Sequence, residues 1–544
     1  MNHHINSELG QLDISTLVIL MVIAAIVAVA VKRIKIPYTV ALVVVGLALG
    51  FFHALQPVAL TEHIVLFIFL PALLFEAAWN LDLRHLKTSV SAIAILATLG
   101  VALSILIIGA CVHYFLELPW IVSLIFGALV APTDPVSVVA IMKKLHLDHK
   151  LSALVEGESL FNDGTSVVFF KLLLAMLMSF GFSIPAESLW GYLSSGFVQF
   201  IIVVLGAAAL GGLIGLSFSV ITKYFNDHLL ELTFTTITAY GSFLLAESIT
   251  VPGSIPHMHL SGVVATVVAG LVMGNYGRQT GMSASTKIVI SSFWEYAAFF
   301  MNSLIFLLIG LEIEISSFVD NWFPITIAIG SVLVARIISV YLLSGLGNLS
   351  KIMHLEINWQ HILVLSGMRG ALSMALVLSI PREILSSELR EVMILMVFGV
   401  VLFTLLVQGL SISSFIKILK LGKIFSPELY RYQFINAQMR SARSAISKLV
   451  QLQHNGEVMD SVADQIQKDL NQEIEELRSE IDTLKISNEM IVLEDTIETK
   501  TQLLQHRKAL INQFTLQGSL NSDSASMIKA EYDAELEKLQ NENS

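Results

Sequence analysis

The stretch that decides the fold is residues 156–170, which read EGESLFNDGTSVVFF. Two glutamates, an asparagine and an aspartate stand here and are followed without a break by apolar sequence. This pattern is typical of a transmembrane helix that carries ionisable groups. A carboxylate near the middle of a bilayer costs at least about 2.5 to 3.5 kcal/mol, so it persists only beside water, a counter-charge or an ion. Asp163 is therefore a candidate functional residue.

One face of this predicted helix gathers oxygen ligands. At 3.6 residues per turn, Ser159, Asn162 and Asp163 fall at i, i+3 and i+4, which places a hydroxyl, an amide oxygen and a carboxylate around one point. Such ligands suit a hard cation such as Na+ or K+, and equally a proton. The alternative is that these polar groups only form hydrogen bonds that hold two helices together. Glu158 points about 140° away from Asp163 on the same helical wheel, so we expect it to have a different role.

The composition indicates an all-α polytopic membrane protein. The 544 residues are 55% hydrophobic and 14% charged, whereas about a quarter of the residues in soluble domains are charged. The single cysteine, Cys111, excludes a disulfide framework and a thiolate zinc cluster. The first apolar stretch, 14–31, has no basic region before it and ends in Lys32 and Arg33, so we expect a retained span and not a signal peptide.

Hydropathy predicts about thirteen transmembrane helices. Apolar windows of suitable length lie near 14–31, 37–55, 62–80, 90–115, 119–142, 151–179, 195–222, 229–250, 260–276, 290–311, 322–347, 358–380 and 391–416. Every other loop carries basic residues: Lys32, Arg33, Lys35, Arg84, Lys87, Lys143, Lys144, Lys150, Lys223, Arg278, Lys287 and Lys351. The intervening loops hold only Arg382 and Arg390. Because cytoplasmic loops are enriched in Lys and Arg, this alternation places the N-terminus outside and the C-terminal tail in the cytoplasm.

Thirteen spans divide as six, one and six, which predicts two six-helix inverted repeats. The corresponding irregularities lie in the fifth span, with APTDP at 131–135, and in the twelfth, with SGMRG at 366–370. Proline removes a backbone donor and glycine loosens a helix, so both spans should unwind in the middle. Broken helices in matched positions predict a binding site where half-helix ends meet.

The ionisable residues of these spans are predicted to lie deep in the membrane. At 1.5 Å per residue Asp163, Asp134 and Arg369 reach roughly 16 to 23 Å from the start of their spans. Glu76 is a little nearer the cytoplasm, where it can line the approach. We expect Arg369 to pair with Glu158 as a structural brace, because an unpaired guanidinium at that depth is very costly.

Other charged residues are expected to have lesser roles. Lys171 and Arg336 can pair or extend toward the membrane surface, and Glu247 and Glu295 lie near span ends. Glu156 lies on the same helix face as Asp163, so it either lines the entrance to the site or is simply solvated. The outer-loop histidines His257 and His259, and His3 and His4 near the N-terminus, are more often inert than pH-sensing.

These motifs resemble a known family. The segments 133–135 (TDP), 157–163 (GESLFND) and 367–371 (GMRGA) are similar to those of the monovalent cation/proton antiporters, which include bacterial NhaP proteins and plant and animal sodium/proton exchangers. The resemblance covers roughly residues 14–416. It implies a homodimer with a dimerisation domain and a mobile core that moves like an elevator, and an electroneutral exchange.

The resemblance also implies roles for individual residues. Asp163 is the carboxylate that binds ion and proton, Asn162 orients it, Ser159 and Thr133 ligate the ion, and Glu76 supplies a further carboxylate. The resemblance likewise implies that Asp134 lies where the two broken spans cross. Asn162 also matters because it is neutral: a single carboxylate that exchanges one proton for one monovalent cation makes transport electroneutral.

The chain is predicted to consist of a transmembrane antiporter domain, 1–420, and a cytoplasmic, mostly helical tail, 421–544. The tail is acidic, with 13 Lys and Arg against 20 Asp and Glu, and therefore a poor match for nucleic acid or anionic lipid. Apolar residues recur at heptad-like spacing: Leu470, Ile474, Leu477, Ile481 and Leu484. This spacing fits either a short coiled coil between two tails or an amphipathic helix packed on its own chain.

The sequence thus predicts a secondary antiporter of a plasma membrane, not an enzyme, that exchanges H+ for Na+, with Li+ or K+ as alternatives. No cofactor is expected beyond the transported ions, and the lack of a P-loop pattern argues against direct drive by ATP. Three other functions remain open at this point: a K+/H+ antiporter, a passive cation channel and a membrane-tethered sensor.

Overall fold

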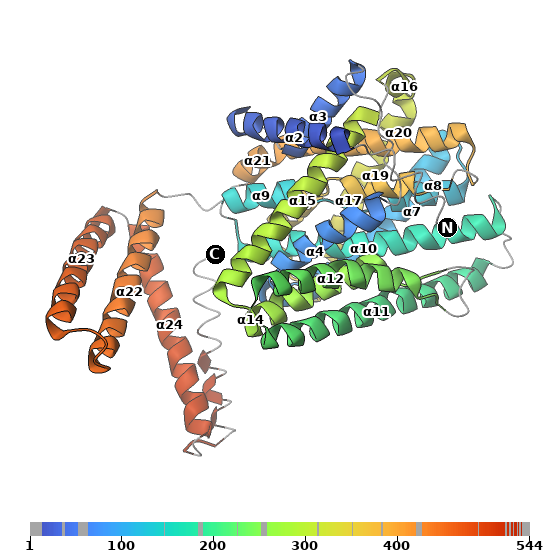
Figure 1. Cartoon of the computed structure of the whole chain (residues 1–544). Helices are drawn as coiled ribbons and strands as arrows, with labels where there is room; N and C mark the ends of the chain where they lie inside the picture. Colours follow the sequence, from blue (N-terminus) through green and yellow to red (C-terminus); the bar gives the residue numbers. More distant parts are fainter. Residues whose placement is uncertain are drawn as a thin grey trace. The chain divides into compact units, whose positions relative to one another are not determined.

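The computed structural model describes residues 14–34, 38–52, 64–145, 147–182, 189–225, 227–251, 258–312, 315–350, 352–381, 384–419, 427–487, 489–516 and short pieces between 519 and 535. The chain forms two compact units, Met1–Lys423 and Ile424–Ser544. Figure 1 shows that both are helical. Within the described ranges the only extended pairing is an isolated antiparallel bridge between Thr250 and His259.

The first unit is a bundle of apolar helices. Its elements are α2 (Ile14–Ile34), α3 (Tyr38–Phe51), η2 (Ile64–Phe69), α4 (Leu70–Asn80), α5 (Leu83–Thr88), α6 (Val90–Ile95), η3 (Leu96–Gly100), α7 (Val101–Leu116), α8 (Trp120–Leu129), α9 (Val136–Lys144), α10 (His149–Phe180), α11 (Leu189–Ile221), η5 (Thr222–Tyr224), α12 (His228–Ser248), α13 (Gly262–Val272), η6 (Met273–Gly277), α14 (Arg278–Thr280), α15 (Ala284–Glu312), α16 (Ile315–Asp320), α17 (Trp322–Leu349), α18 (Ile357–Leu365), α19 (Ala371–Leu378), α20 (Ser387–Phe403), η7 (Thr404–Gln408) and α21 (Gly409–Ile418).

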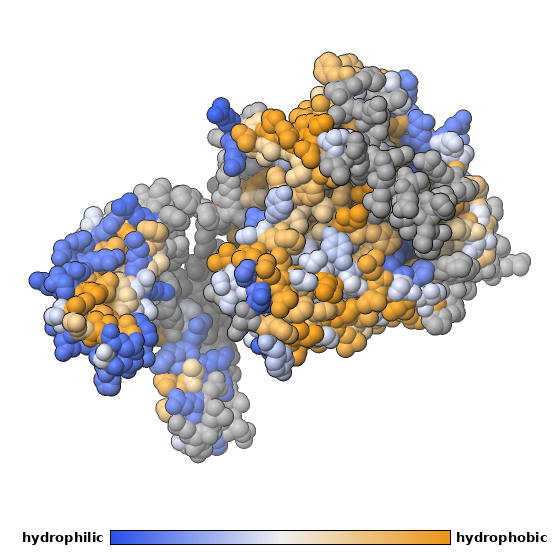
Figure 2. Space-filling model, viewed as in Figure 1, coloured by the Kyte–Doolittle hydropathy of each residue, from blue (hydrophilic) through white to orange (hydrophobic). Residues whose placement is uncertain are grey.

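Eight helical stretches of the described chain are long and apolar enough to cross a membrane. Figure 2 shows apolar residues over much of the visible surface of this unit, as expected for a surface that faces lipid. Each of the thirteen predicted windows coincides with a helix, a run of consecutive helices or a broken pair of helices. The chain is therefore an all-helical, multi-pass membrane protein, while the count of thirteen crossings and the inverted repeat stay predictions.

Both predicted helix breaks are present. The chain leaves the helical conformation over residues 131–135, between α8 and α9, and again over 367–370, between α18 and α19. Pro132 and Pro135 lack the backbone N–H that a continuous helix needs, and Gly367 and Gly370 carry no side chain to fill the space around a helix. Each break places a half-helix end inside the bundle.

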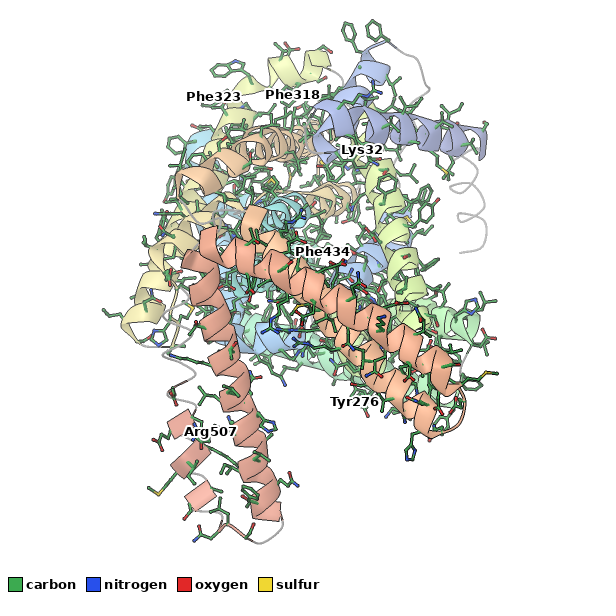
Figure 3. All side chains as sticks on the ribbon, turned by 90° about the vertical axis from the view of Figure 1, so that its left-hand side faces the viewer. Lys32, Tyr276, Phe318, Phe323, Phe434 and Arg507 are labelled. Carbon is green, nitrogen blue, oxygen red and sulfur yellow. The ribbon has the colours of Figure 1, made fainter. Side chains whose placement is uncertain are left out.

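The long helices in the described part of the second unit are α22 (Pro427–His454), α23 (Asp460–Ser487) and α24 (Glu489–Leu516). The first two pack along each other and bury Tyr432, Ile435 and Met439 of α22 against Ile481 of α23. Gly456, with φ of 72°, lies in the turn between them, a conformation that favours glycine. Figure 3 shows this pair of helices, with Phe434 labelled on α22.

Two of the predicted heptad residues, Leu477 and Leu484, pack against this small core. The apolar face of α23 is thus covered by a helix of the same chain, as the second of the two sequence interpretations expected. The cytoplasmic location of the tail stays a prediction.

Candidate functional site

Asp163 lies in the middle of α10, on the wall of a cavity of about 560 Å³. Ser159, Thr133, Asp134 and Glu76 line the same cavity. The Oδ1 atom of Asp163 is buried and has no hydrogen-bond partner among the described residues. A buried polar atom without a partner costs free energy unless water or an ion completes it. The structure thus presents an uncompensated carboxylate oxygen beside an open space.

The cavity reaches the surface on the side of the N-terminal half of α10. The α10 residues that line it are Glu156, Ser159, Leu160 and Asp163, all in that half. Several other lining residues are exposed: Ala77, Asn80, Val136, Ala140 and Glu295. Asp163 therefore faces a space that is continuous with the outside of the protein on this side.

Thr133 joins the first helix break to α10. Its hydroxyl donates to Ser159 Oγ at 3.1 Å, and Ser159 Oγ donates in turn to the carbonyl of Thr133. Asn162 Nδ2 donates to Thr133 Oγ1 at 2.6 Å, and the Thr133 N–H donates to Asn162 Oδ1 at 3.3 Å. These bonds satisfy backbone groups that the break leaves without helical partners.

The common face predicted for Ser159, Asn162 and Asp163 is only partly correct. Ser159 and Asp163 line the cavity, whereas Asn162 lines a small buried space beside Arg336 and Glu158. The reason is geometric: Asn162 and Asp163 are separated by about 100° around the helix, and the edge of the cavity falls between them. The amide is engaged by Thr133 and Glu158 and does not point into the cavity.

The two breaks cross at Asp134. Its N–H donates to the carbonyl of Met368 at 2.7 Å, and its Oδ1 accepts from the N–H of Val136 at 3.0 Å. A Cβ atom placed on Gly370 would lie 2.6 Å from the Cβ of Asp134, so only glycine fits here without displacement. The crossing combines a carboxylate with the N-terminal end of α19, whose positive partial charge favours it.

Replacing Gly370 with alanine should therefore destabilise the protein. The added methyl group collides with Asp134, and overpacking of this kind costs about 1 to 3 kcal/mol. The expected result is a lower midpoint of thermal unfolding of the purified protein. Gly330 is the matched control, because no atom lies within 4 Å of a Cβ placed there. Equal midpoints for the Gly370→Ala and Gly330→Ala variants would contradict the close crossing.

The predicted ion pair between Glu158 and Arg369 is wrong. Glu158 is paired with Arg336 of α17: Arg336 Nη1 donates to Oε1 at 2.8 Å and Nη2 to Oε2 at 3.0 Å. Arg336 also donates to the carbonyl of Leu363 at the C-terminal end of α18. The two-pronged guanidinium matches a carboxylate in this geometry, so the pair is fully engaged.

Arg369 is held differently. Its Nη1 donates to the carbonyl of Gly367 at 2.8 Å, and its backbone N–H donates to Thr404 Oγ1 at 3.0 Å. Its buried Nε has no partner among the described residues. Arg336 occupies the position next to Glu158, and a side chain at Gly367 would lie 2.7 Å from Arg336 Nε. The sequence contained a signal for Arg336, since it lies near the middle of the window 322–347, too deep to extend to the surface.

The remaining predicted residues are placed as follows. Glu76 accepts from Asn80 Nδ2 at 2.7 Å, and Glu295 is exposed at the cavity. Lys171 pairs with Glu247, as one of the two predicted alternatives allowed. His3, His4 and His257 lie outside the described residues. No three His, Cys, Asp or Glu residues of the described chain are close enough to hold one metal ion, so any bound cation must complete its shell with other oxygens.

Comparison with known proteins identifies the family. The family model described as sodium/hydrogen exchanger, transmembrane, matches residues 18–418. The chain belongs to the sodium/hydrogen exchanger family. Among its relatives, the Na(+)/H(+) antiporter ApNhaP of Aphanothece halophytica is 42% identical over 393 residues, which cover 72% of this chain and 70% of the relative. The Na(+)/H(+) antiporter NhaG of Bacillus atrophaeus is 35% identical and matches 99% of both chains.

The fold of this exchanger family is also found in a solved structure. The sodium proton antiporter MjNhaP1 of Methanocaldococcus jannaschii superposes with a TM-score of 0.64 at 21% identity and covers 75% of this chain and 99% of that one. Membership of the exchanger family makes the chain a secondary transporter for cations and protons, and not an enzyme.

Proposed function

We propose that the protein exchanges Na+ for H+ with no net movement of charge, and that the two ions compete for Asp163. The observation that carries this proposal is the buried Oδ1 of Asp163, which has no partner among the described residues and borders the cavity. Either a proton or a cation neutralises the carboxylate. Only the neutralised site can pass the apolar barrier, so the two ions must be exchanged and cannot leak.

The surrounding residues take supporting roles in this proposal. Asp163 supplies the charge, while the hydroxyl groups of Ser159 and Thr133 can turn toward the cation as ligands. Glu76 offers a further carboxylate on the cavity wall, and Asp134 remains at the helix crossing. Asn162 orients the site through Thr133 rather than by touching the ion. Water completes the shell of a hard monovalent cation, and Li+ or K+ can use the same ligands.

The transport cycle is proposed to follow an elevator movement of a core that carries α10, in a homodimer of a plasma membrane. The cavity opens toward the end of the bundle where Arg84 and Lys150 lie, which are among the basic residues of the predicted cytoplasmic loops. On that topology, the structure is an inward-facing state. Because Asn162 is neutral, Asp163 is the one carboxylate of this adjacent pair that can exchange a proton, which makes a one-for-one exchange.

Competition predicts a specific dependence on pH. Where protons occupy most of the sites, the KM for Na+ should fall about tenfold for each unit by which the pH rises, because fewer protons compete. The maximal rate should change less. Initial rates of Na+-dependent proton movement, measured over a range of pH at each Na+ concentration, check this. A KM that stays constant while only the maximal rate changes would show that the two ions use separate sites.

The decisive experiment on function is proton exchange in proteoliposomes, followed with a pH-sensitive dye in Na+, Li+, K+ or choline. An antiporter gives a signal with metal cations and none with choline, and an electroneutral one gives the same rate when an ionophore clamps the voltage. A rate that follows the imposed voltage would favour a channel. A signal with K+ alone would assign the protein as a K+/H+ antiporter.

A further inference from the structure

A second charged pair lies on α10, away from the cavity. Lys171 Nζ contacts both carboxylate oxygens of Glu247, each at 2.7 Å, and Glu247 Oε1 also accepts from the N–H of Gly262 at 3.1 Å. The side chains are 30% and 17% exposed, so the pair is largely withdrawn from solvent. Glu247 thereby connects three helices: α10 through Lys171, its own helix α12, and the first residue of α13.

This pair lies on the opposite side of Asp163 from the cavity. All α10 residues that line the cavity precede or include Asp163, whereas Lys171 is eight residues further on, or about 12 Å along the helix. Glu247 is near the C-terminal end of α12, and Gly262 begins α13. The ion pair therefore joins α10 to α12 and α13 beyond Asp163, on the side away from this cavity.

Two separate apolar clusters meet on α10 next to the pair. In Figure 1, α10 runs between α7, α8 and α17 on one side and α11 and α12 on the other. Val167 and Phe170 belong to the large apolar core, which includes the first group and also Phe243 of α12 and Val263 of α13. Val168 and Leu172 belong to a separate small cluster with Val203, Ala207, Ala246, Val251, Met258, Leu260 and Ala265. Lys171 lies at the boundary between the two clusters.

We propose that the ion pair of Lys171 with Glu247 is a latch that holds the side of the transporter opposite the cavity closed and opens once in every transport cycle. The proposal rests on the proposed elevator movement. If α10 moves with α7, α8 and α17 past α12 and α13, Lys171 leaves Glu247 and the N–H of Gly262. If all these helices formed one rigid body, the same contacts would be permanent and without effect on transport.

Reversible cross-linking tests the latch. The only cysteine, Cys111, is first replaced by serine, and cysteines are then introduced by Lys171→Cys and Glu247→Cys. A bifunctional methanethiosulfonate with a spacer about as long as the two lost side chains links them in proteoliposomes. We expect Na+-dependent proton exchange to fall at least about tenfold on linking and to return when a reductant cleaves the spacer, because the linked helices cannot separate.

The control joins the end of α17 to α6, which continues through η3 into α7 and so belongs to the moving body of the proposal. Ser91 of α6 donates to the carbonyl of Ile352, just after α17, at 2.8 Å, and both residues are exposed. Linking the Ser91→Cys, Ile352→Cys variant should leave exchange unchanged. Unaltered exchange after linking positions 171 and 247, or an equal loss in this control pair, would overturn the latch. A wrong proposed function is recognised separately, because then neither unlinked variant exchanges ions.

Discussion

Asp163→Asn should reduce cation-dependent proton movement to the background of empty vesicles. The amide keeps the shape of the side chain but can neither release a proton at physiological pH nor offer a negative charge to a cation. The structure supports so large an effect because Oδ1 of Asp163 is buried beside the cavity without a partner among the described residues. The measurement is dye-monitored proton uptake in everted vesicles after addition of Na+.

Glu156→Gln is the matched control for this change. Glu156 lines the same cavity from the same helix, seven residues nearer the opening, and the substitution removes the same charge. We expect this variant to raise the KM for Na+ while exchange persists, since the carboxylate at the bottom of the cavity remains. Substantial antiport by the Asp163→Asn variant would refute the assignment of the shared site.

Breaking the pair of Glu158 with Arg336 should give the largest loss of stability. Glu158→Gln leaves the buried guanidinium without a compensating charge, which costs about 3 to 5 kcal/mol. The double change Glu158→Gln, Arg336→Gln removes both charges. It should lower the midpoint of thermal unfolding less than either single change. Midpoints of thermal unfolding of the purified variants in detergent provide the comparison.

Arg369 provides the control for this double-mutant cycle. It lies near Glu158 and Arg336, but its own hydrogen bonds go to the backbone of Gly367 and to the Thr404 hydroxyl. Combining Glu158→Gln with Arg369→Gln should therefore come closer to additivity than combining it with Arg336→Gln. Strict additivity of the Glu158 and Arg336 changes would show that they do not act as a pair.

The features that the sequence predicts well are those that depend on local chemistry. The breaks at 131–135 and 367–370 follow from proline and glycine within otherwise apolar spans, whatever the neighbouring helices do. The place of Asp163 in the middle of a long helix follows from the apolar sequence around the polar run. The contact of Asp134 with the second break also agrees with the predicted meeting of the half-helices.

The sequence does not determine those features that depend on the rotation of a helix about its own axis. Depth along a span can be counted, and Arg336 and Arg369 both lie deep, so the count could not choose between them as partner of Glu158. The rotation of α17 and α18 in the bundle decides it, and that rotation depends on contacts between distant segments. Asn162 was misplaced for the same reason, because the edge of the cavity is set by α4, α9 and α15 as well as by α10.

The crossing of the two breaks has one more consequence. The bond from the Asp134 N–H to the Met368 carbonyl joins main chain to main chain, so it does not depend on the chemistry of either side chain. Substitutions on the cavity wall that leave this peptide contact in place can change ion preference without dismantling the scaffold. Selectivity in this protein should therefore be open to laboratory evolution at the residues around the carboxylate.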